Sequence, residues 1–410
     1  MTSTTLFRIA ASGLIAGLAL RAQAGVETAQ KQQPAIRYRL TDLGTLGGTY
    51  SYAFGINNAG EVAGAAATPG QVGGLAQTAF VWFRGRMRNM GTLGGKNSAA
   101  SGVNAWGEAA ILSETSDQDP DGEDVCAFGT HAQCQAAIWN GHELRSLPAL
   151  PGGRNAFAIN VNDRGQVIGS SENGVRDSTC SNGTPNQVLR FEAVLWQPNG
   201  KPQELLPLPG DTVGFAFGIN NKGQVTGASG SCSDTALPPA PNGRHAVLWQ
   251  RDGTPIDLGD LGGGAFNIAG SINDGGEVAG TSLSAKDGVV HAFLWTKETG
   301  MQDYGAFPGA FLTVPPCCNT LNDRGEMAGF AIDSNGNSRA LVWVKKVPVD
   351  LNTLIPQNSG WYLQAAESIN DDGQIAGYGV IGGNVHAFLA TPARGYQKDE
   401  IGAEDLTRPQ

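Results

Sequence analysis

Residues Asp42–Gly64 read DLGTLGGTYSYAFGINNAGEVAG, and residues Asp257–Gly280 read DLGDLGGGAFNIAGSINDGGEVAG. Weaker copies of the same segment fill the chain between and after these two. Anchored on the leucine before the double glycine, or on its equivalent, the seven copies are marked by Leu46, Leu93, Leu150, Leu208, Leu261, Phe307 and Leu354. Their spacings of 46 to 58 residues indicate a repeat protein in which each copy is one supersecondary unit. We number these units repeats 1 to 7.

Every repeat carries an asparagine directly after an apolar stretch, followed by a glycine-containing turn such as NNAGEVAG or NDRGEMAG. Glycine at such a position permits positive φ, so the flanking apolar runs are predicted to form a β-hairpin. We interpret the asparagines as residues that tie the turns to the strands through side-chain hydrogen bonds. They are Asn57, Asn104, Asn162, Asn220, Asn273, Asn322 and Asn370.

A third apolar run follows in each repeat, as in HAFLW at His291–Trp295, and a polar turn then leads to a fourth strand with the next DLG. Apolar residues at successive positions predict a strand that is buried on both faces. The tryptophan that ends this run is predicted to fill the gaps between repeats. Six repeats have it, and repeat 7 has Ala390 instead; the six are Trp82, Trp139, Trp196, Trp249, Trp295 and Trp343.

The two ends of the repeat region complement each other. The region begins with a fourth strand, IRYRLTDLG, and its last repeat stops after a third strand. Pairing of Arg37–Leu43 with His386–Leu389 would supply the missing strand and close a ring. We therefore predict an all-β fold, a seven-bladed β-propeller of four-stranded repeats over residues 36–393, rather than an open solenoid, which would need polar capping repeats.

The motifs GINNAGEVAG, HAFLW and DLGTLGG resemble those of the HAF-repeat proteins, a family of presumed extracellular bacterial repeat proteins. The resemblance covers nearly all of residues 36–393. It implies secretion and a β-propeller-like fold, and it implies no particular activity. Ala390, and the absence of the motif histidine from four repeats, depart from the family pattern.

The amino terminus has the pattern of a secretory signal peptide over residues 1–24: Arg8, an apolar stretch of 12 residues and the small-x-small site Ala22–Ala24. Residues 25–35 would be a flexible leader, and residues 394–410 a polar, disordered tail. Without the signal peptide, 25 basic residues stand against 37 acidic ones, which argues against nucleic acid and anionic membranes as partners. We expect a secreted, periplasmic or extracellular monomer with no membrane insertion.

An acidic loop in repeat 2 is the strongest chemical signal. Asp117, Asp119 and Asp121 alternate and are followed by Gly122, as in oxygen-rich loops that wrap Ca²⁺. The pattern departs from a 12-residue EF-hand loop because Phe128 stands where the bidentate Glu belongs, and Asp124 could replace it only through a different wrap. A structural Ca²⁺ ion held by these four aspartates is one hypothesis, and a solvated acidic loop is the other. We expect no other cofactor.

Six cysteines fit an oxidising compartment. Four of them lie in the enlarged links between the second and third strands of repeats 2 to 4, which a propeller would place side by side. We predict that Cys126 bonds to Cys134 and Cys180 to Cys232. Cys317 and Cys318 form either a vicinal bridge or two separate ends.

Three histidines recur at the start of third strands, and packing is favoured over metal binding because no pair has short ligand spacing. They are His245, His291 and His386. Trp106 and Trp361 fall outside the repeat pattern, and either could be exposed as a platform for a sugar ring.

Two classes of function stay open. We favour a binding module whose glycan or protein partner contacts the enlarged loops Ile111–Gln135, Ser170–Phe191 and Ala228–Arg244, because long loops on a rigid scaffold are common recognition sites. The alternative is a secreted hydrolase or lyase acting at the central channel, by analogy of fold alone. Its acids would be the recurring aspartates, although turn capping explains them better; they are Asp42, Asp257, Asp303 and Asp350.

Overall fold

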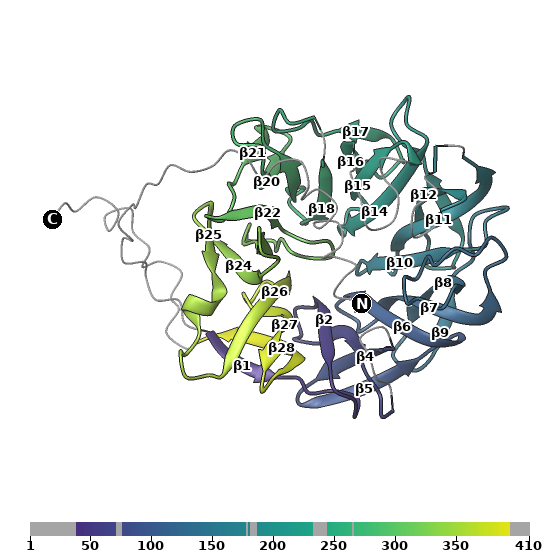
Figure 1. Cartoon of the computed structure of the whole chain (residues 1–410). Helices are drawn as coiled ribbons and strands as arrows, with labels where there is room; N and C mark the ends of the chain where they lie inside the picture. The colour runs from purple at the N-terminus through teal and green to yellow at the C-terminus, as the bar shows by residue number, and fades with distance from the viewer. Residues whose placement is uncertain are drawn as a thin grey trace.

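The computed structural model describes residues 38–70, 76–177, 179–180, 187–232, 244–264 and 266–393. Antiparallel sheets follow one another around a common axis (Figure 1), which is the architecture of a β-propeller. In this part of the chain, no helix is both long and apolar enough to span a membrane. The predicted signal peptide, leader and tail lie outside the described residues.

Each of repeats 1 to 4 forms one sheet of four strands in chain order. Repeat 1 comprises β2 (Ser51–Ile56), β3 (Val62–Ala66), β4 (Thr78–Phe83) and β5 (Arg86–Gly91). Repeat 2 comprises β6 (Gly94–Val103), β7 (Ala109–Gln118), β8 (Ala132–Trp139) and β9 (Leu144–Ser146). Repeat 3 comprises β10 (Ala156–Val161), β11 (Val167–Arg176), β12 (Leu189–Trp196) and β13 (Pro202–Leu205). Repeat 4 comprises β14 (Val213–Ile219), β15 (Val225–Gly230), β16 (His245–Trp249) and β17 (Pro255–Asp257).

Repeats 5 and 6 share one eight-stranded sheet. Repeat 5 comprises β18 (Ile268–Ile272), β19 (Val278–Leu283), β20 (Val290–Thr296) and β21 (Gly300–Asp303). Repeat 6 comprises β22 (Ala310–Val314), β23 (Ala328–Asp333), β24 (Ser338–Val344) and β25 (Val347–Asp350), with the short 3₁₀ helix η1 (Leu351–Leu354) after it. The two halves meet at a single parallel residue pair, Val290 with Leu312.

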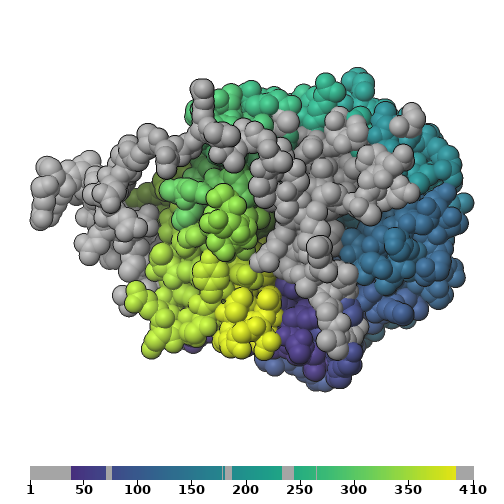
Figure 2. Space-filling model, in the orientation of Figure 1, coloured from purple at the N-terminus to yellow at the C-terminus, as the bar shows by residue number. Residues whose placement is uncertain are grey.

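Both ends of the described chain contribute to the sheet of repeat 7. It comprises β26 (Trp361–Ile369), β27 (Ile375–Ile381), β28 (Asn384–Pro392) and, beside β28, β1 (Tyr38–Asp42). The antiparallel register runs from Tyr38 opposite Pro392 to Asp42 opposite Phe388. The predicted pairing of the two chain ends is therefore confirmed for the described residues. Figure 2 shows the two ends of the colour scale, purple and yellow, side by side on the surface.

The turn between the first and second strands has the same construction in every repeat. In repeat 7, the side-chain oxygen of Asn370 accepts hydrogen bonds from the backbone nitrogens of Asp372 and Gln374. Its side-chain nitrogen donates to Oε1 of Gln374, and Gly373 between them has φ of 71°. These bonds explain why each turn combines Asn, Gly and then Glu or Gln. The prediction that the asparagines tie turns to strands is confirmed.

The same asparagines also connect the repeats, which the sequence did not predict. Each side-chain nitrogen donates to the backbone oxygen of the asparagine in the next repeat, over 2.8 to 3.1 Å, and the last bond runs from Asn370 back to Asn57. All seven asparagines are at most 5% exposed. We call this closed circuit the asparagine ring.

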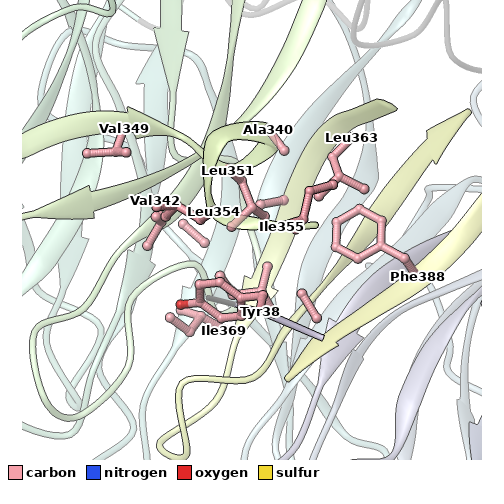
Figure 3. Packing of buried hydrophobic residues seen from close by; sticks show 14 residues of the cluster. Tyr38, Ala340, Val342, Val349, Leu351, Leu354, Ile355, Leu363, Ile369 and Phe388 are labelled. Carbon is pink, nitrogen blue, oxygen red and sulfur yellow. The ribbon is translucent and has the colours of Figure 1, made fainter. Parts of the chain in front are cut away.

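Apolar side chains fill the interfaces between neighbouring repeats. Trp249 of repeat 4 is fully buried against Ile168 and Leu205 of repeat 3, and its indole nitrogen donates to the backbone oxygen of Leu206. This arrangement confirms the predicted packing role for Trp249. The largest cluster lies between repeats 6 and 7, where Val342, Ile369 and Phe388 are among the buried residues (Figure 3).

We predict that Asn370→Ala lowers the free energy of unfolding by about 2 to 4 kcal/mol, because it removes four hydrogen bonds, one buried and three partly buried, and leaves their partners unsatisfied. Urea titration followed by tryptophan fluorescence measures the effect. Asn140 caps an exposed turn and makes no bond to the next repeat, so Asn140→Ala should cost less than about 1 kcal/mol. Equal costs for the two variants would contradict a special role of the ring.

Candidate functional site

The propeller has two unlike faces. The asparagine turns occupy one face, which we call the turn face. The links between second and third strands leave from the other, which we call the loop face, because the second strand runs antiparallel to the first and ends opposite the turn. The enlarged links of repeats 2 to 4 belong to the loop face. Much of the repeat 4 link, residues 233–243, lies outside the described residues.

Disulfides hold the enlarged links as predicted. Cys126 bonds to Cys134 within the repeat 2 link, and Cys180 of repeat 3 bonds to Cys232 of repeat 4. Both predicted pairings are confirmed. Cys317 and Cys318 are free thiols, so of the two alternatives for this pair the vicinal bridge is not formed.

Polar contacts also join the link of repeat 2 to repeat 3. Asp121 accepts from Arg154 at 2.9 Å and from Arg176 at 2.7 Å. The hydrogen bond from Arg176 is the main reason why the pKa of the Asp121 carboxyl is lowered. Oε1 of Glu123 accepts from the backbone nitrogen of Val188. The enlarged links of three repeats are thus joined by covalent and polar bonds.

Buried carboxyl groups lie beneath this surface. Glu172 is fully buried and accepts from both the backbone and the side chain of Asn155, whose side chain also donates to Asp119. Burial, followed by the nearby Glu172 carboxylate, raises the pKa of Glu123 to about 8. Burial beside a second carboxyl group thus favours the protonated form of Glu123.

The four aspartates of the calcium hypothesis have separate surroundings. Oδ1 of Asp119 accepts from the backbone nitrogens of Asp121 and Glu123, and Asp121 carries two arginines. Asp124 accepts from Gly129 through Oδ2, while its buried Oδ1 has no hydrogen-bond partner. Asp117 is exposed. Within the described ranges, no three His, Cys, Asp or Glu side chains are grouped so as to hold a metal ion.

A shallow cup lies on the axis at the turn face, with a volume of about 130 Å³. Its floor is the asparagine ring. Around it, the residues that follow the ring asparagines form a second circuit of hydrogen bonds. In each bond, the backbone nitrogen of one such residue donates to the side-chain oxygen of its equivalent in the next repeat, as Asp274 donates to Asp323 at 2.7 Å. The circuit has six bonds because repeat 2 has Ala105 at this position. The sequence did not predict this cup.

Trp106 stands beside the cup. Its side chain is on the turn face and 75% exposed, while its indole nitrogen donates to the backbone oxygen of Asp163. The predicted exposure is confirmed for Trp106. Trp361 is partly buried instead, because it packs edge-on against Phe388 with ring centroids 6.1 Å apart.

The axis is obstructed just beyond the asparagine ring. The side chain of Asn160 in repeat 3 donates to Asn319 in repeat 6, two repeats that are not neighbours in the ring. The backbone oxygen of Asn319 also accepts from Ser368 and from Ile369 of repeat 7. Chains from opposite sides therefore meet at the centre. Next to this contact, Glu367 is 3% exposed with its Oε1 unpartnered, and burial raises its pKa to about 8.

The recurring aspartates cap turns, as predicted. Asp42, Asp257 and Asp303 each accept from the backbone nitrogen two residues on, and Asp350 does the same with Asn352. They end the fourth strands, which are the strands farthest from the axis. Three of them also pair with a basic side chain on the adjacent third strand, namely His386 with Asp42, His291 with Asp303 and Arg339 with Asp350.

These histidine contacts were missed from the sequence. Nδ1 of His291 lies 2.8 Å from Asp303, and its Nε2 lies 2.9 Å from Asp287. His245 contacts Asp211 instead of the aspartate of its own fourth strand. Each histidine thus pairs with one or two carboxylates of its own repeat, and the three do not come together.

Several solved structures are similar to this chain at low sequence identity. Virginiamycin B lyase from Staphylococcus aureus, crystallised as a catalytically inactive variant with quinupristin, is 10% identical with a TM-score of 0.48, over 87% of this chain and all of that one. The β-propeller domain of the Trilobed protease from Pyrococcus furiosus is 8% identical with a TM-score of 0.47, over 83% and 93%. Puromycin hydrolase is 13% identical with a TM-score of 0.51, over 85% of this chain and 52% of that one. No family model and no curated protein sequence matches the chain.

The calcium hypothesis predicts saturable heat in calorimetric titration with millimolar Ca²⁺, lost in the double variant Asp117→Asn/Asp124→Asn. These two residues keep an exposed carboxylate and an unpartnered oxygen, whereas Asp119 and Asp121 have other partners in the structure. A titration without heat would contradict the calcium hypothesis. Heat that persists in the double variant would mean that the ion binds at other residues.

We predict that Glu367→Gln makes the protein more stable than the native chain, by a margin that grows as the pH rises from about 4.5 to 8. The folded protein holds this proton up to pH about 8, whereas the unfolded chain releases it near pH 4.5, so proton release favours unfolding in this window. The margin should grow by roughly 1.4 kcal/mol per pH unit. Urea titrations of both proteins across this range measure it, and a constant margin would contradict the buried acid.

Proposed function

We propose that the protein is a secreted seven-bladed β-propeller that acts as a binding module, and that its loop face at repeats 2 to 4 recognises a glycan or a protein outside the cell. We count the eight-stranded sheet as two blades, because its halves meet at one residue pair. Seven ring asparagines support the same count.

One observation carries the binding proposal: enlarged links from three repeats are bonded to one another before any partner arrives. The Cys180–Cys232 disulfide joins repeats 3 and 4, and Asp121 of repeat 2 pairs with two arginines of repeat 3. A surface that is already ordered loses less conformational entropy when it binds. Val175 beside these bonds is 45% exposed, and Arg176, although it pairs with Asp121, keeps 69% of its side chain exposed, so a partner can reach an apolar and a cationic side chain.

The alternative, a hydrolase or lyase acting in a central channel, has less support in the described residues. The recurring aspartates cap turns on the outermost strands, and the Asn160–Asn319 contact crosses the axis. Catalysis would require acids, bases or nucleophiles that converge on one reacting atom. The lyase and hydrolase among the similar structures share only the fold with this chain.

The proposals on secretion and on the HAF-repeat family rest on the sequence, with one structural support. Two disulfides in the described residues fit an oxidising compartment outside the cytoplasm. A calcium ion in the repeat 2 link stays a proposal too, supported by the buried and unpartnered Oδ1 of Asp124.

Glycan arrays and pull-downs from extracellular fractions, both with the protein from residue 25 onward, test the function. The double variant Val175→Ser/Arg176→Ala should weaken binding of the captured partner about tenfold, because it removes an apolar and a cationic contact. Trp106→Ala, which alters an exposed side chain on the other face, is the matched control and should leave affinity unchanged. If Trp106→Ala weakens binding and the loop variant does not, the recognition surface is the turn face and the proposal is wrong.

A further inference from the structure

Repeat 6 differs from the other repeats in its first strand. Elsewhere this strand runs up to the residue before the ring asparagine, as β14 does with Ile219 before Asn220. In repeat 6, β22 ends at Val314, and residues 315–321, PPCCNTL, lie between it and Asn322. The two prolines have no backbone N–H to donate to the sheet, so the strand ends there.

Two consecutive residues of this segment have a left-handed backbone conformation. The φ angle is 73° at Cys318 and 75° at Asn319. Asparagine often adopts this conformation, but cysteine rarely does. The surrounding structure holds the segment in place, because Asn319 accepts hydrogen bonds from Asn160 of repeat 3 and from Ser368 and Ile369 of repeat 7. Backbone strain that is held in this way is a pointer to function.

The thiols of Cys317 and Cys318 lie in contact in this strained segment. A hydrogen bond joins the two thiols, and both are free of disulfides. Cys317 is partly exposed, whereas Cys318 is only 1% exposed. Burial, followed by the hydrogen bond with Cys317, raises the pKa of the Cys318 thiol well above its usual value. Because the thiolate is the reactive form, a reagent from solution reacts first with Cys317.

Metal binding and oxidation are the two common uses of a pair of adjacent thiols. A structural zinc site needs four ligands, most often cysteine or histidine. Within the described part of the chain, no third His, Cys, Asp or Glu side chain is grouped with the pair so as to hold a metal ion. Oxidation needs only the two sulfur atoms, so the arrangement favours redox chemistry.

We propose that Cys317 and Cys318 are a redox-modification site, at which a small disulfide such as glutathione disulfide oxidises the two thiols to a vicinal disulfide and thereby loosens the contact across the axis. The Cys317 thiolate attacks one sulfur of the reagent, forms a mixed disulfide and releases one thiol, which takes up the Cys317 proton. Cys318 then attacks the Cys317 sulfur, and the second thiol leaves with the Cys318 proton. The two cysteines are oxidised, and the reagent is reduced to two thiols.

Oxidation moves the backbone beside the axis. Consecutive Cα atoms lie about 3.8 Å apart across a trans peptide, whereas the Cα atoms of a disulfide usually lie about 4.4 to 6.8 Å apart, so the peptide between the two cysteines distorts when the ring closes. Asn319 is the next residue, and its bond from Asn160 is therefore weakened in the oxidised protein. The site is separate from the enlarged links of the loop face, so it does not depend on the proposed binding function.

Equilibration of the protein with glutathione buffers of increasing disulfide content tests the proposal. The remaining thiols are alkylated, and the protein is digested with trypsin without reduction. Mass spectrometry of the peptide Glu298–Arg324 then reports on the pair, because this peptide contains no other cysteine. We expect it to change from doubly alkylated to an internal disulfide as the buffer becomes more oxidising. A peptide that stays doubly alkylated, or that carries glutathione without closing the disulfide, would overturn the proposal.

A single substitution tests the order of the two steps. Cys318→Ser should stop the reaction at the mixed disulfide, with one glutathione on Cys317, because the attacking thiol of the second step is gone. If this variant stays unmodified in the same buffers, Cys317 is not the residue that reacts first, and the proposed chemistry is wrong.

The link to the axis is tested through its reciprocity. If oxidation weakens the bond from Asn160 to Asn319, removal of that bond favours oxidation equally. Asn160→Ala should therefore raise the equilibrium constant for oxidation about fivefold. Asn140→Ala, at an exposed turn, is the matched control and should leave the constant unchanged. No shift in Asn160→Ala, or the same shift in both variants, would overturn the link.

A measurement on the native chain serves if Asn160→Ala does not fold. The backbone nitrogen of Ile369 donates to the backbone oxygen of Asn319. Hydrogen exchange at this amide should therefore be faster in the oxidised protein than in the reduced one. Equal exchange rates in the two states would overturn the link to the axis.

Discussion

The asparagine ring is the constraint on which the rest of the molecule depends. Seven buried side chains each make two kinds of bond at once, holding their own turn and donating to the backbone of the next repeat. Because the donors and acceptors are buried, a repeat that shifted along the axis would leave polar groups without partners, at a cost of about 1 to 3 kcal/mol each. The ring therefore fixes the height of every repeat relative to its neighbours, and the strands, turns and links take their positions from it.

Much of this fold could be predicted from the sequence because it depends on local chemistry repeated seven times. Asn, Gly and Glu or Gln at fixed spacing define a turn, and an apolar run ending in Trp defines a buried strand. The source of the fourth strand of repeat 7 could also be predicted, because Tyr38–Asp42 needed the edge of a sheet to pair with. The contacts between repeats were harder. The acceptor of each ring asparagine is a backbone oxygen. Because every residue has one, the sequence does not indicate which residue accepts the bond.

The candidate sites show the same limit. Disulfide pairing was predictable because equivalent links of neighbouring repeats must lie together, and cysteines mark them. The alternating aspartates of repeat 2 suggested one cluster, but Asp119 bonds to backbone nitrogens and Asn155 while Asp121 bonds to two arginines of repeat 3. Those partners are 33 to 55 residues away for Asp121, and spacing within a loop carries no information about them.

The direction of the asparagine ring has a further consequence. Every donor serves the repeat that follows it, and the bond from Asn370 to Asn57 is of the same kind and length as the others, although repeat 7 is the repeat whose third and fourth strands, β28 and β1, come from opposite ends of the described chain. The asparagine ring is therefore the same whether or not the third and fourth strands of a repeat are consecutive in the chain. A circularly permuted gene that opened the chain in the turn between another pair of third and fourth strands would therefore encode the same propeller. Its two chain ends would pair in a different repeat.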